Sequence, residues 1–233
     1  MTPSSPAPGG FRRLALALAA LLLLAGAAAA PAAAAVRILA FGDSLTAGSG
    51  LPPAQGFTAQ LEAWLHAHGA PDATVANAGV PGETTGEGLA RISRTLGPPG
   101  DPRFDAVIVE LGGNDMLDRL DLADMRRNLD GILTEIGRRD LPVLLAGLPA
   151  SPTYPAAWRR EFKATYRDLA RRHGAIYVSS FFAGMAEGRS VPEIMALFQP
   201  DGLHPNAAGV AAIVEGIGPA VLKLVERARP MTR

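Results

Sequence analysis

The chain contains 233 residues, with 22 basic and 22 acidic side chains and no cysteine. This balance offers no basic surface for nucleic acid or for anionic lipid, so neither is expected as a partner. Without cysteine, the chain forms no disulfide, carries no lipid on a cysteine and has no thiolate chemistry. Roughly 200 residues follow the N-terminal segment, which is enough for one domain with a full core.

Residues 1–35 have the layout of a secretory signal peptide. Arg12 and Arg13 precede an alanine- and leucine-rich run over residues 14–30, and the whole segment contains no acidic residue. This pattern predicts cleavage at the alanine-rich end of the segment and export to the periplasm or the medium. An uncleaved membrane anchor and a buried helix are the alternatives, although the run is short for a membrane span. The two arginines are also a weak indication of twin-arginine export. We therefore expect a mature domain of residues 36–233 without a stable membrane anchor.

Beyond this segment, apolar runs of strand length alternate with segments of helical period. Strands are predicted at residues 36–41, 73–76, 106–111, 143–148 and 175–178. Several are apolar at nearly every position, as expected of strands that are buried on both faces. Helices are predicted at residues 57–68, 85–96, 122–136, 156–173 and 207–226. We expect the last helix to break around Gly218 and Pro219, because proline lacks the N–H that a helix needs. The alternation predicts an α/β fold with a parallel sheet that helices cover on both faces.

Loops of unusual composition follow the first three predicted strands. Ser44 follows the first strand, Gly82 lies in the loop after the second, and Asn114 follows the third. In sheets of this kind, ligands bind beyond the carboxyl ends of the strands, at a switch point of the topology. A functional site is therefore expected where these loops meet.

Each of these residues also has an ordinary structural explanation. Asp43 and Ser44 could cap a helix, since both residue types are good N-caps. Gly79 and Gly82 could serve only a tight turn. Asn114 could bridge backbone groups within its loop, as asparagine commonly does.

Only one of the four histidines is placed for acid–base chemistry. His66 and His68 belong to a predicted amphipathic helix, and His173 occupies the last turn of another helix, where an imidazole interacts favourably with the helix dipole. His204 instead stands in a polar loop three residues after Asp201, although it could also be no more than the entry to the last helix. Any imidazole general base must therefore be His204.

Four sequence blocks together resemble the GDSL, or SGNH, hydrolase superfamily. In chain order they are Gly42-Asp-Ser44-Leu, Gly82-Glu-Thr, Gly-Gly-Asn114-Asp and Asp201-Gly-Leu-His204-Pro. The strongest resemblance is to the bacterial periplasmic arylesterase, acyl-CoA thioesterase and lysophospholipase group, and it spans nearly the whole predicted mature chain. It implies a three-layer α/β/α sandwich with a mostly parallel, five-stranded sheet of the flavodoxin-like type.

The resemblance also implies a role for each residue of the blocks. Ser44 would be the nucleophile, His204 the base that takes its proton, and Asp201 the carboxylate that orients and stabilises the imidazole. The backbone N–H groups of Ser44 and Gly82 and the side-chain amide of Asn114 would form an oxyanion hole. No cofactor and no metal are implied.

Other catalytic sites fit the sequence less well. The glycines around Ser44 have neither the spacing of a dinucleotide site nor the lysine of a P-loop. Thr46 stands where the nucleophile elbow of an α/β-hydrolase requires its second glycine. A metal site built on Asp201 and His204 would need further ligands, and no other histidine or cysteine lies near them in the sequence.

The sequence therefore predicts a serine hydrolase that cleaves small-molecule carboxylic esters, and thioesters as well. A glycan O-acetylesterase of the same superfamily and a non-catalytic periplasmic binding protein are the alternatives. Tyr154, Met195 and Phe198 are candidate substrate-binding residues, because they flank polar loop residues within apolar, proline-containing segments. Core packing is the ordinary explanation for the neighbouring Ile194 and Leu197.

Overall fold

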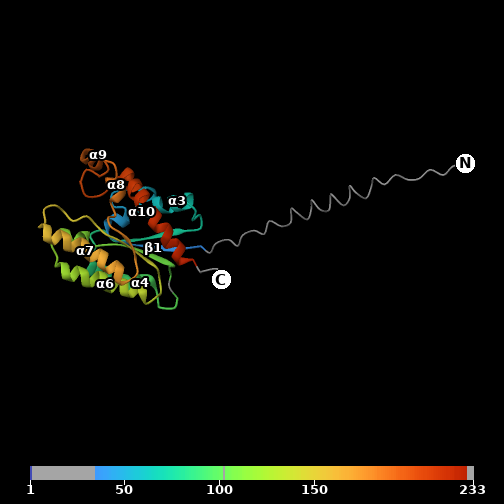
Figure 1. Cartoon of the computed structure of the whole chain (residues 1–233), viewed down its shortest axis with the longest axis horizontal. Helices are drawn as coiled ribbons and strands as arrows, with labels where there is room; N and C mark the ends of the chain where they lie inside the picture. Colours follow the sequence, from blue (N-terminus) through green and yellow to red (C-terminus); the bar gives the residue numbers. More distant parts are fainter. Residues whose placement is uncertain (2–34, 102, 230–233) are drawn as a thin grey trace. The chain divides into compact units, whose positions relative to one another are not determined.

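A computed structural model describes Met1, residues 35–101 and residues 103–229 (Figure 1). The chain divides into two units, Met1–Ala33 and Ala34–Arg233. The fold described below lies in the second unit. The predicted signal peptide falls outside the described residues, except for its first and last residues.

Five parallel strands form one sheet in the order β2-β1-β3-β4-β5. The strands are β1 (Arg37–Gly42), β2 (Thr74–Gly79), β3 (Ala106–Glu110), β4 (Val143–Ala146) and β5 (Ile176–Val178). Strands β3 and β4 are buried at every position, which explains their apolar sequences. The predicted parallel sheet is confirmed, although the third and fourth strands end earlier than expected, at Glu110 and Ala146.

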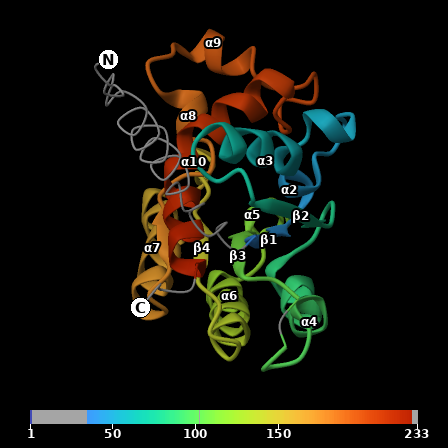
Figure 2. The same ribbon diagram turned by 90° about the vertical axis from the view of Figure 1, so that its right-hand side faces the viewer.

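Helices cover both faces of the sheet, so the fold has the three layers that the sequence predicts. Helices α3 (Phe57–Ala67) and α10 (Ala207–Ala228) pack together on one face, and the other face carries α4 (Thr85–Leu96), α6 (Leu122–Gly137) and α7 (Ala156–Arg172) (Figures 1 and 2). The buried residues of α6 recur every three or four positions, which gives the helix one apolar stripe toward the sheet.

Short helical segments lie in the connections that follow the strands. They are α2 (Ser44–Ala47), the 3-10 turn η1 (Pro53–Gln55), α5 (Gly113–Leu117), α8 (Ala183–Ala186) and α9 (Val191–Met195). Strand β1 lies between β2 and β3, so the connections after these three strands are neighbours in space. This topology brings together the loops that the sequence singles out.

The predicted break in the last helix is wrong. Helix α10 continues from Ala207 to Ala228 although Pro219 lies inside it. Pro219 is on the exposed side, and so is Glu215, whose carbonyl loses its helical partner and can bind water instead. Buried residues on both sides of the proline, such as Ile217 and Val221, hold the helix in place, so packing outweighs one missing hydrogen bond.

Helix α10 is also, within the described residues, the helix that is long and apolar enough to cross a membrane. Half of its most apolar 18-residue stretch is buried inside the protein. Such burial, together with its packing against α3 and α8, identifies α10 as a helix of the core.

Candidate active site

Ser44 begins helix α2 directly after β1, and its side chain contacts the loop that contains Asp201 and His204. Nε2 of His204 lies 2.9 Å from Oγ of Ser44. Nδ1 of the same ring lies 2.7 Å from Oδ2 of Asp201. Both distances are in hydrogen-bond range, so the three side chains form one continuous row. The structure thus brings together the serine, histidine and aspartate that the sequence proposes as partners.

The carboxylate of Asp201 is held in its charged form. Its Oδ1 accepts hydrogen bonds from the backbone N–H groups of Leu203 (2.9 Å) and His204 (3.0 Å). The imidazole bond, followed by these two backbone bonds, lowers the pKa of Asp201 to about 2. A charged Asp201 accepts the hydrogen of Nδ1, which leaves Nε2 of a neutral imidazole free to accept the proton of Ser44.

Gln199 fixes the loop that carries the histidine. Its backbone N–H donates to the carbonyl of His204 at 2.7 Å, and its side-chain amide donates to the carbonyls of Pro205 (3.0 Å) and Ser49 (2.8 Å). Ser49 lies just after α2, so the hydrogen bonds of Gln199 connect the loop of His204 to the segment that follows Ser44. The sequence contains no signal for this connection, because all three acceptors are backbone carbonyls.

The two glycines after β2 have different tasks. A β carbon at Gly79 would lie 2.2 Å from the backbone nitrogen of Ala47, so this glycine permits close packing against α2. Gly82 has open space around it but a φ of +81°, a left-handed conformation that residues with a side chain rarely adopt. Gly82 therefore makes the turn after β2, and its backbone is exposed.

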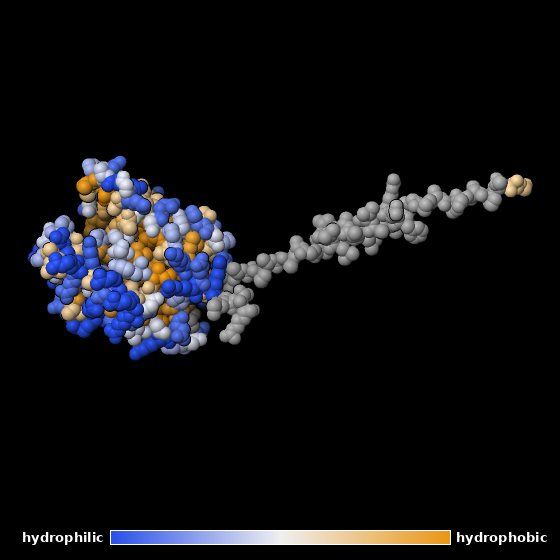
Figure 3. All heavy atoms as spheres, viewed as in Figure 1, coloured by the Kyte–Doolittle hydropathy of each residue, from blue (hydrophilic) through white to orange (hydrophobic). Residues whose placement is uncertain are grey.

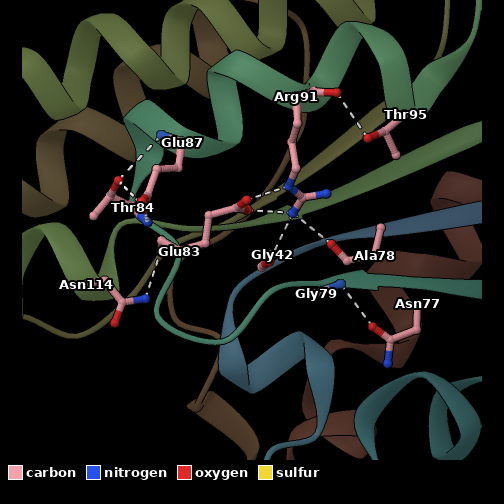
Figure 4. Close-up of polar contacts among 10 residues, drawn as sticks. All are labelled: Gly42, Asn77, Ala78, Gly79, Glu83, Thr84, Glu87, Arg91, Thr95 and Asn114. Carbon is pink, nitrogen blue, oxygen red and sulfur yellow. Dashed lines mark hydrogen bonds and ion pairs between the residues drawn. The ribbon is translucent and has the colours of Figure 1, made fainter.

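Asn114 lies in α5 and reaches toward both neighbouring loops. Its Nδ2 donates to Oδ2 of Asp43 at 3.1 Å. The same nitrogen donates to the backbone carbonyl of Glu83 at 2.9 Å, the contact drawn in Figure 4. Asn114 thus bridges other groups, as expected of an asparagine, and its two hydrogen bonds join the connections after β1, β2 and β3. Both N–H groups of the amide have protein acceptors, so a substrate oxygen has to share one of them.

Two acidic side chains beside Ser44 are buried. Oδ1 of Asp43 accepts from the N–H of Leu45 at 3.0 Å, and Oε2 of Glu110 accepts from Oγ1 of Thr46 at 2.8 Å. Burial raises the pKa of Asp43 to about 6, although the bond from Leu45 opposes this shift. Burial and then the charge of Asp43 raise the pKa of Glu110 well above its ordinary value. Asp43 is the helix cap that the sequence suggests, whereas no role for Glu110 was predicted.

A cavity of about 400 Å³ opens beside Ser44 and Asn114. Its lining is mainly apolar, with contributions from the connections after β1, β3, β4 and β5. The larger apolar side chains in the lining include Met116, Leu148, Phe182, Met185, Ile194 and Phe198. Figure 3 shows apolar atoms at the α9 end of the described unit, whereas the surface over α6 and α7 is mostly hydrophilic.

The three predicted substrate-binding residues are placed differently. Phe198 lines the cavity, but Tyr154 and Met195 are not part of the lining. Tyr154 donates from its hydroxyl to the backbone carbonyl of Met116, a lining residue, and stacks on a tryptophan with ring centroids 4.0 Å apart. Met195 is 53% exposed on α9. Ile194, for which core packing was the ordinary explanation, lines the cavity instead.

The other histidines have partners outside this cavity. His66 and His68 each contact a backbone carbonyl at 2.7 Å, and His173 contacts the carboxylate of Asp130 at 2.6 Å. In the part of the chain that the structure describes, no group of three or more histidine, aspartate or glutamate side chains is arranged to hold a metal ion.

Comparison with known proteins identifies the family. Residues 40–212 match the GDSL-like Lipase/Acylhydrolase family. Esterase TesA of Pseudomonas aeruginosa is 31% identical over 191 residues, which cover 82% of this chain and 90% of that protein. Thioesterase 1/protease 1/lysophospholipase L1 of Escherichia coli (strain K12) is 31% identical over 170 residues, covering 72% of this chain and 75% of its own.

A solved structure gives the same answer. AlinE4, an SGNH-hydrolase family esterase, superimposes with a TM-score of 0.65 at 43% sequence identity, covering 81% of this chain and 96% of its own. The resemblance seen in the sequence blocks is confirmed, and so is the prediction of a carboxylic ester hydrolase. The chain belongs to the GDSL-like lipase/acylhydrolase family.

Proposed function

We propose that this chain is a serine esterase that also cleaves thioesters, through an acyl-enzyme on Ser44. The observation that carries the proposal is the row of contacts from Ser44 through His204 to Asp201 beside an apolar cavity. Helix capping does not explain the hydroxyl of Ser44, because Asp43 already caps α2. A hydroxyl in contact with an imidazole that a carboxylate orients is the arrangement of an activated nucleophile.

In the first half of the reaction, Oγ of Ser44 attacks the carbonyl carbon of the substrate while its proton passes to Nε2 of His204. The bond to the leaving alcohol or thiol then breaks, and the leaving group takes the proton from Nε2. In the second half, water adds to the acyl carbon by the same route and releases the acid and free Ser44. Asp201 stabilises the imidazolium that forms in each half.

The negative oxygen of each tetrahedral intermediate would be held by the backbone N–H groups of Ser44 and Gly82 and by the amide of Asn114. The N–H of Ser44 opens helix α2, so no earlier carbonyl of that helix accepts it. The amide of Asn114 bonds to a neutral carbonyl of Glu83. An oxyanion is a stronger acceptor than a neutral carbonyl, so it can draw a share of this donor as charge develops.

The apolar cavity supports an acyl chain as the part of the substrate that is bound. A volume of about 400 Å³ is at the small end of ligand sites in proteins. Each buried methylene contributes about 0.8 kcal/mol, so kcat/KM should rise from acetyl to butyryl and hexanoyl esters until the cavity is full. Thioesters form the same tetrahedral intermediate, and the relative from Escherichia coli is named as a thioesterase and a lysophospholipase.

The test is hydrolysis of p-nitrophenyl acetate, butyrate and hexanoate and of a butyryl thioester, by the wild-type protein and by Ser44→Ala. The variant should fold normally and lose several orders of magnitude in kcat, and a serine-directed organophosphate should abolish wild-type activity. Retention of more than about a tenth of the activity by folded Ser44→Ala would exclude Ser44 as the nucleophile. Much faster turnover of acetylated glycans than of these substrates would favour the O-acetylesterase. If none of the esters, thioesters or acetylated glycans is hydrolysed, a binding protein is favoured.

We also propose that residues 1–35 are a cleaved signal peptide and that the mature protein is periplasmic or secreted. The paired arginines, the apolar run and the absence of acidic residues support this. Mass spectrometry after expression in a bacterial host should find a mature start close to Val36 in the exported fraction. An intact N-terminus in the cytosol would contradict export.

A further inference from the structure

The side chain of Arg91 joins the connections that carry the proposed catalytic groups. Arg91 lies on α4, and its guanidinium pairs with both carboxylate oxygens of Glu83 (Figure 4). The same group donates to the carbonyl of Ala78 at 2.8 Å, and a longer contact of 3.4 Å reaches the carbonyl of Gly42. Ala78 and Gly42 lie at the carboxyl ends of β2 and β1, so one side chain connects two strands and a loop.

This arginine is held in one orientation. Its guanidinium carbon lies 3.9 Å from the ring centroid of Phe41, which is fully buried in β1. The side chains of Arg91 and Glu83 are only 16% and 4% exposed. A planar guanidinium makes two parallel bonds to a carboxylate and stacks on an aromatic ring, neither of which a lysine ammonium reproduces.

Glu83 connects this ion pair to the proposed oxyanion hole. Its side chain is bound by Arg91, its backbone carbonyl accepts the amide of Asn114 at 2.9 Å, and it directly follows Gly82. On the other side of this short segment, the N–H of Thr85 donates to Oδ2 of Asp115 at 2.8 Å. The segment that supplies the Gly82 N–H and accepts the Asn114 amide is thus held at both ends, by Arg91 of α4 and by Asp115 of α5.

We propose that Arg91 and Glu83 are positioning residues for ester hydrolysis, because their buried ion pair sets the geometry of the Gly82 N–H and the Asn114 amide. The inference rests on the function proposed above for this site. Oxyanion donors act by being fixed before charge develops, so a small displacement costs transition-state binding more than substrate binding. Loss of the pair should therefore lower kcat and leave KM nearly unchanged.

The test compares Arg91→Lys and Glu83→Gln with the control Arg139→Lys. Arg139 is as buried, with its side chain 2% exposed, and it donates to the carbonyls of Gly97 and Glu135, both at 2.8 Å, outside the cavity lining. With p-nitrophenyl butyrate, Arg91→Lys and Glu83→Gln should each lower kcat about tenfold to a hundredfold, with KM within about threefold. Arg139→Lys should keep kcat within about twofold. Titration of active sites with an organophosphate corrects every kcat for any unfolded fraction.

A double variant separates positioning from general loosening of the fold. If the pair acts through Asn114, then Arg91→Lys and Asn114→Ala together should lower kcat by clearly less than the product of their single effects. Independent, multiplicative effects would overturn the inference. So would unchanged kcat, or an effect on KM alone, in correctly folded Arg91→Lys and Glu83→Gln.

Ser44→Ala tells the two proposals apart. If that variant keeps wild-type activity, the proposed function fails, and the positioning role fails with it. If Ser44→Ala is inactive and the two substitutions of the ion pair have no effect, the positioning role alone is rejected.

Discussion

The two ends of the central sheet bury charge in different ways. At the carboxyl end, four acidic side chains around Ser44 are buried: Asp43, Glu83, Glu110 and Asp115. At the amino end, within the described residues, the buried charge is Arg139. Its guanidinium donates to the carbonyl of Gly97, just after α4, and to carbonyl and hydroxyl oxygens of Ser93. Carbonyls in the last turn of a helix and just beyond it favour a cation, so this burial is well compensated.

Two of the acids at the carboxyl end, Asp43 and Glu110, are not compensated to the same degree. Burial raises the pKa of both Asp43 and Glu110, and among the residues that the structure describes, none forms a hydrogen bond with Oε1 of Glu110. Groups whose charge is unfavourable lower stability, and they persist in proteins where activity needs them. We infer that the amino end of the sheet serves stability and the carboxyl end serves the reaction. Substitutions at the two ends should therefore affect different measurements.

Among single substitutions that leave Ser44 and His204 intact, Asp201→Asn should have the largest effect on kcat. Asparagine can no longer accept the hydrogen of Nδ1 as a charged group, so His204 is presented to Ser44 in the wrong tautomer. We expect kcat to fall about 10³- to 10⁴-fold while the fold is retained, because the side chain of Asp201 is 46% exposed. Steady-state kinetics with p-nitrophenyl butyrate and thermal unfolding check both parts. A fall of only a few-fold would remove Asp201 from the proposed catalytic row.

Asn114→Ala should come next, with kcat about 10²- to 10³-fold lower and little change in KM, because a donor in the proposed oxyanion hole would act mainly in the transition state. Asn128→Ala is the matched control. Asn128 donates to Oγ1 of Thr85 at 3.2 Å, so it touches the same segment without reaching the cavity. The control should change kcat less than about threefold. An effect of Asn114→Ala confined to KM would assign this residue to substrate binding instead.

At the amino end, Arg139→Met should lower the free energy of unfolding by about 1–3 kcal/mol, because several buried carbonyls lose their donor. Its kcat should stay at the wild-type value. Arg138→Met is the control: its side chain is 63% exposed, and it should cost at most about 0.5 kcal/mol. Urea unfolding and ester kinetics measure both quantities. Equal losses of stability in the two variants, or a large loss of kcat in Arg139→Met, would remove the contrast between the ends of the sheet.

The sequence predicts the strands and the main helices because the order of their apolar residues reflects which positions are buried. Strand β3 is apolar along its length up to Glu110, and α6 repeats its apolar residues with helical period. The break expected at Pro219 was wrong because packing on both sides of a residue is not a local property. The order of strands then brings Ser44 and Asn114 together, as expected from their places after the first and third predicted strands.

The surroundings of the site were less predictable. Arg91 donates hydrogen bonds to a backbone carbonyl and to Glu83, which precedes α4. No local sequence pattern distinguishes such an arginine from one that is exposed to solvent. Tyr154 was a candidate for substrate binding because it flanks polar loop residues within an apolar, proline-containing segment. Its hydroxyl instead bonds to the carbonyl of Met116, a contact that depends on the relative placement of two loops. Cavity walls are therefore a property of the packed fold.

The effect of Glu110→Gln should appear only as pH is varied. Because the pKa of Glu110 is raised in the folded protein, the folded chain keeps a proton that the unfolded chain releases. The contribution of Glu110 is therefore fully present below the unfolded pKa, about 4.3, and is lost as pH rises toward the folded value. Glutamine cannot ionise, so the variant should gain on the wild type by up to about 1.4 kcal/mol per pH unit in this window.

Thermal unfolding of the wild type and of Glu110→Gln from pH 4 to pH 8 measures this trend. Any constant offset between the two proteins reflects packing and hydrogen bonds to Thr46, so only the change of the difference with pH bears on the proton. Glu215→Gln, on the exposed side of α10, should run parallel to the wild type. Parallel curves for Glu110→Gln as well would mean that Glu110 is charged without cost. The contrast in buried charge between the two ends of the sheet would then rest on Asp43 alone.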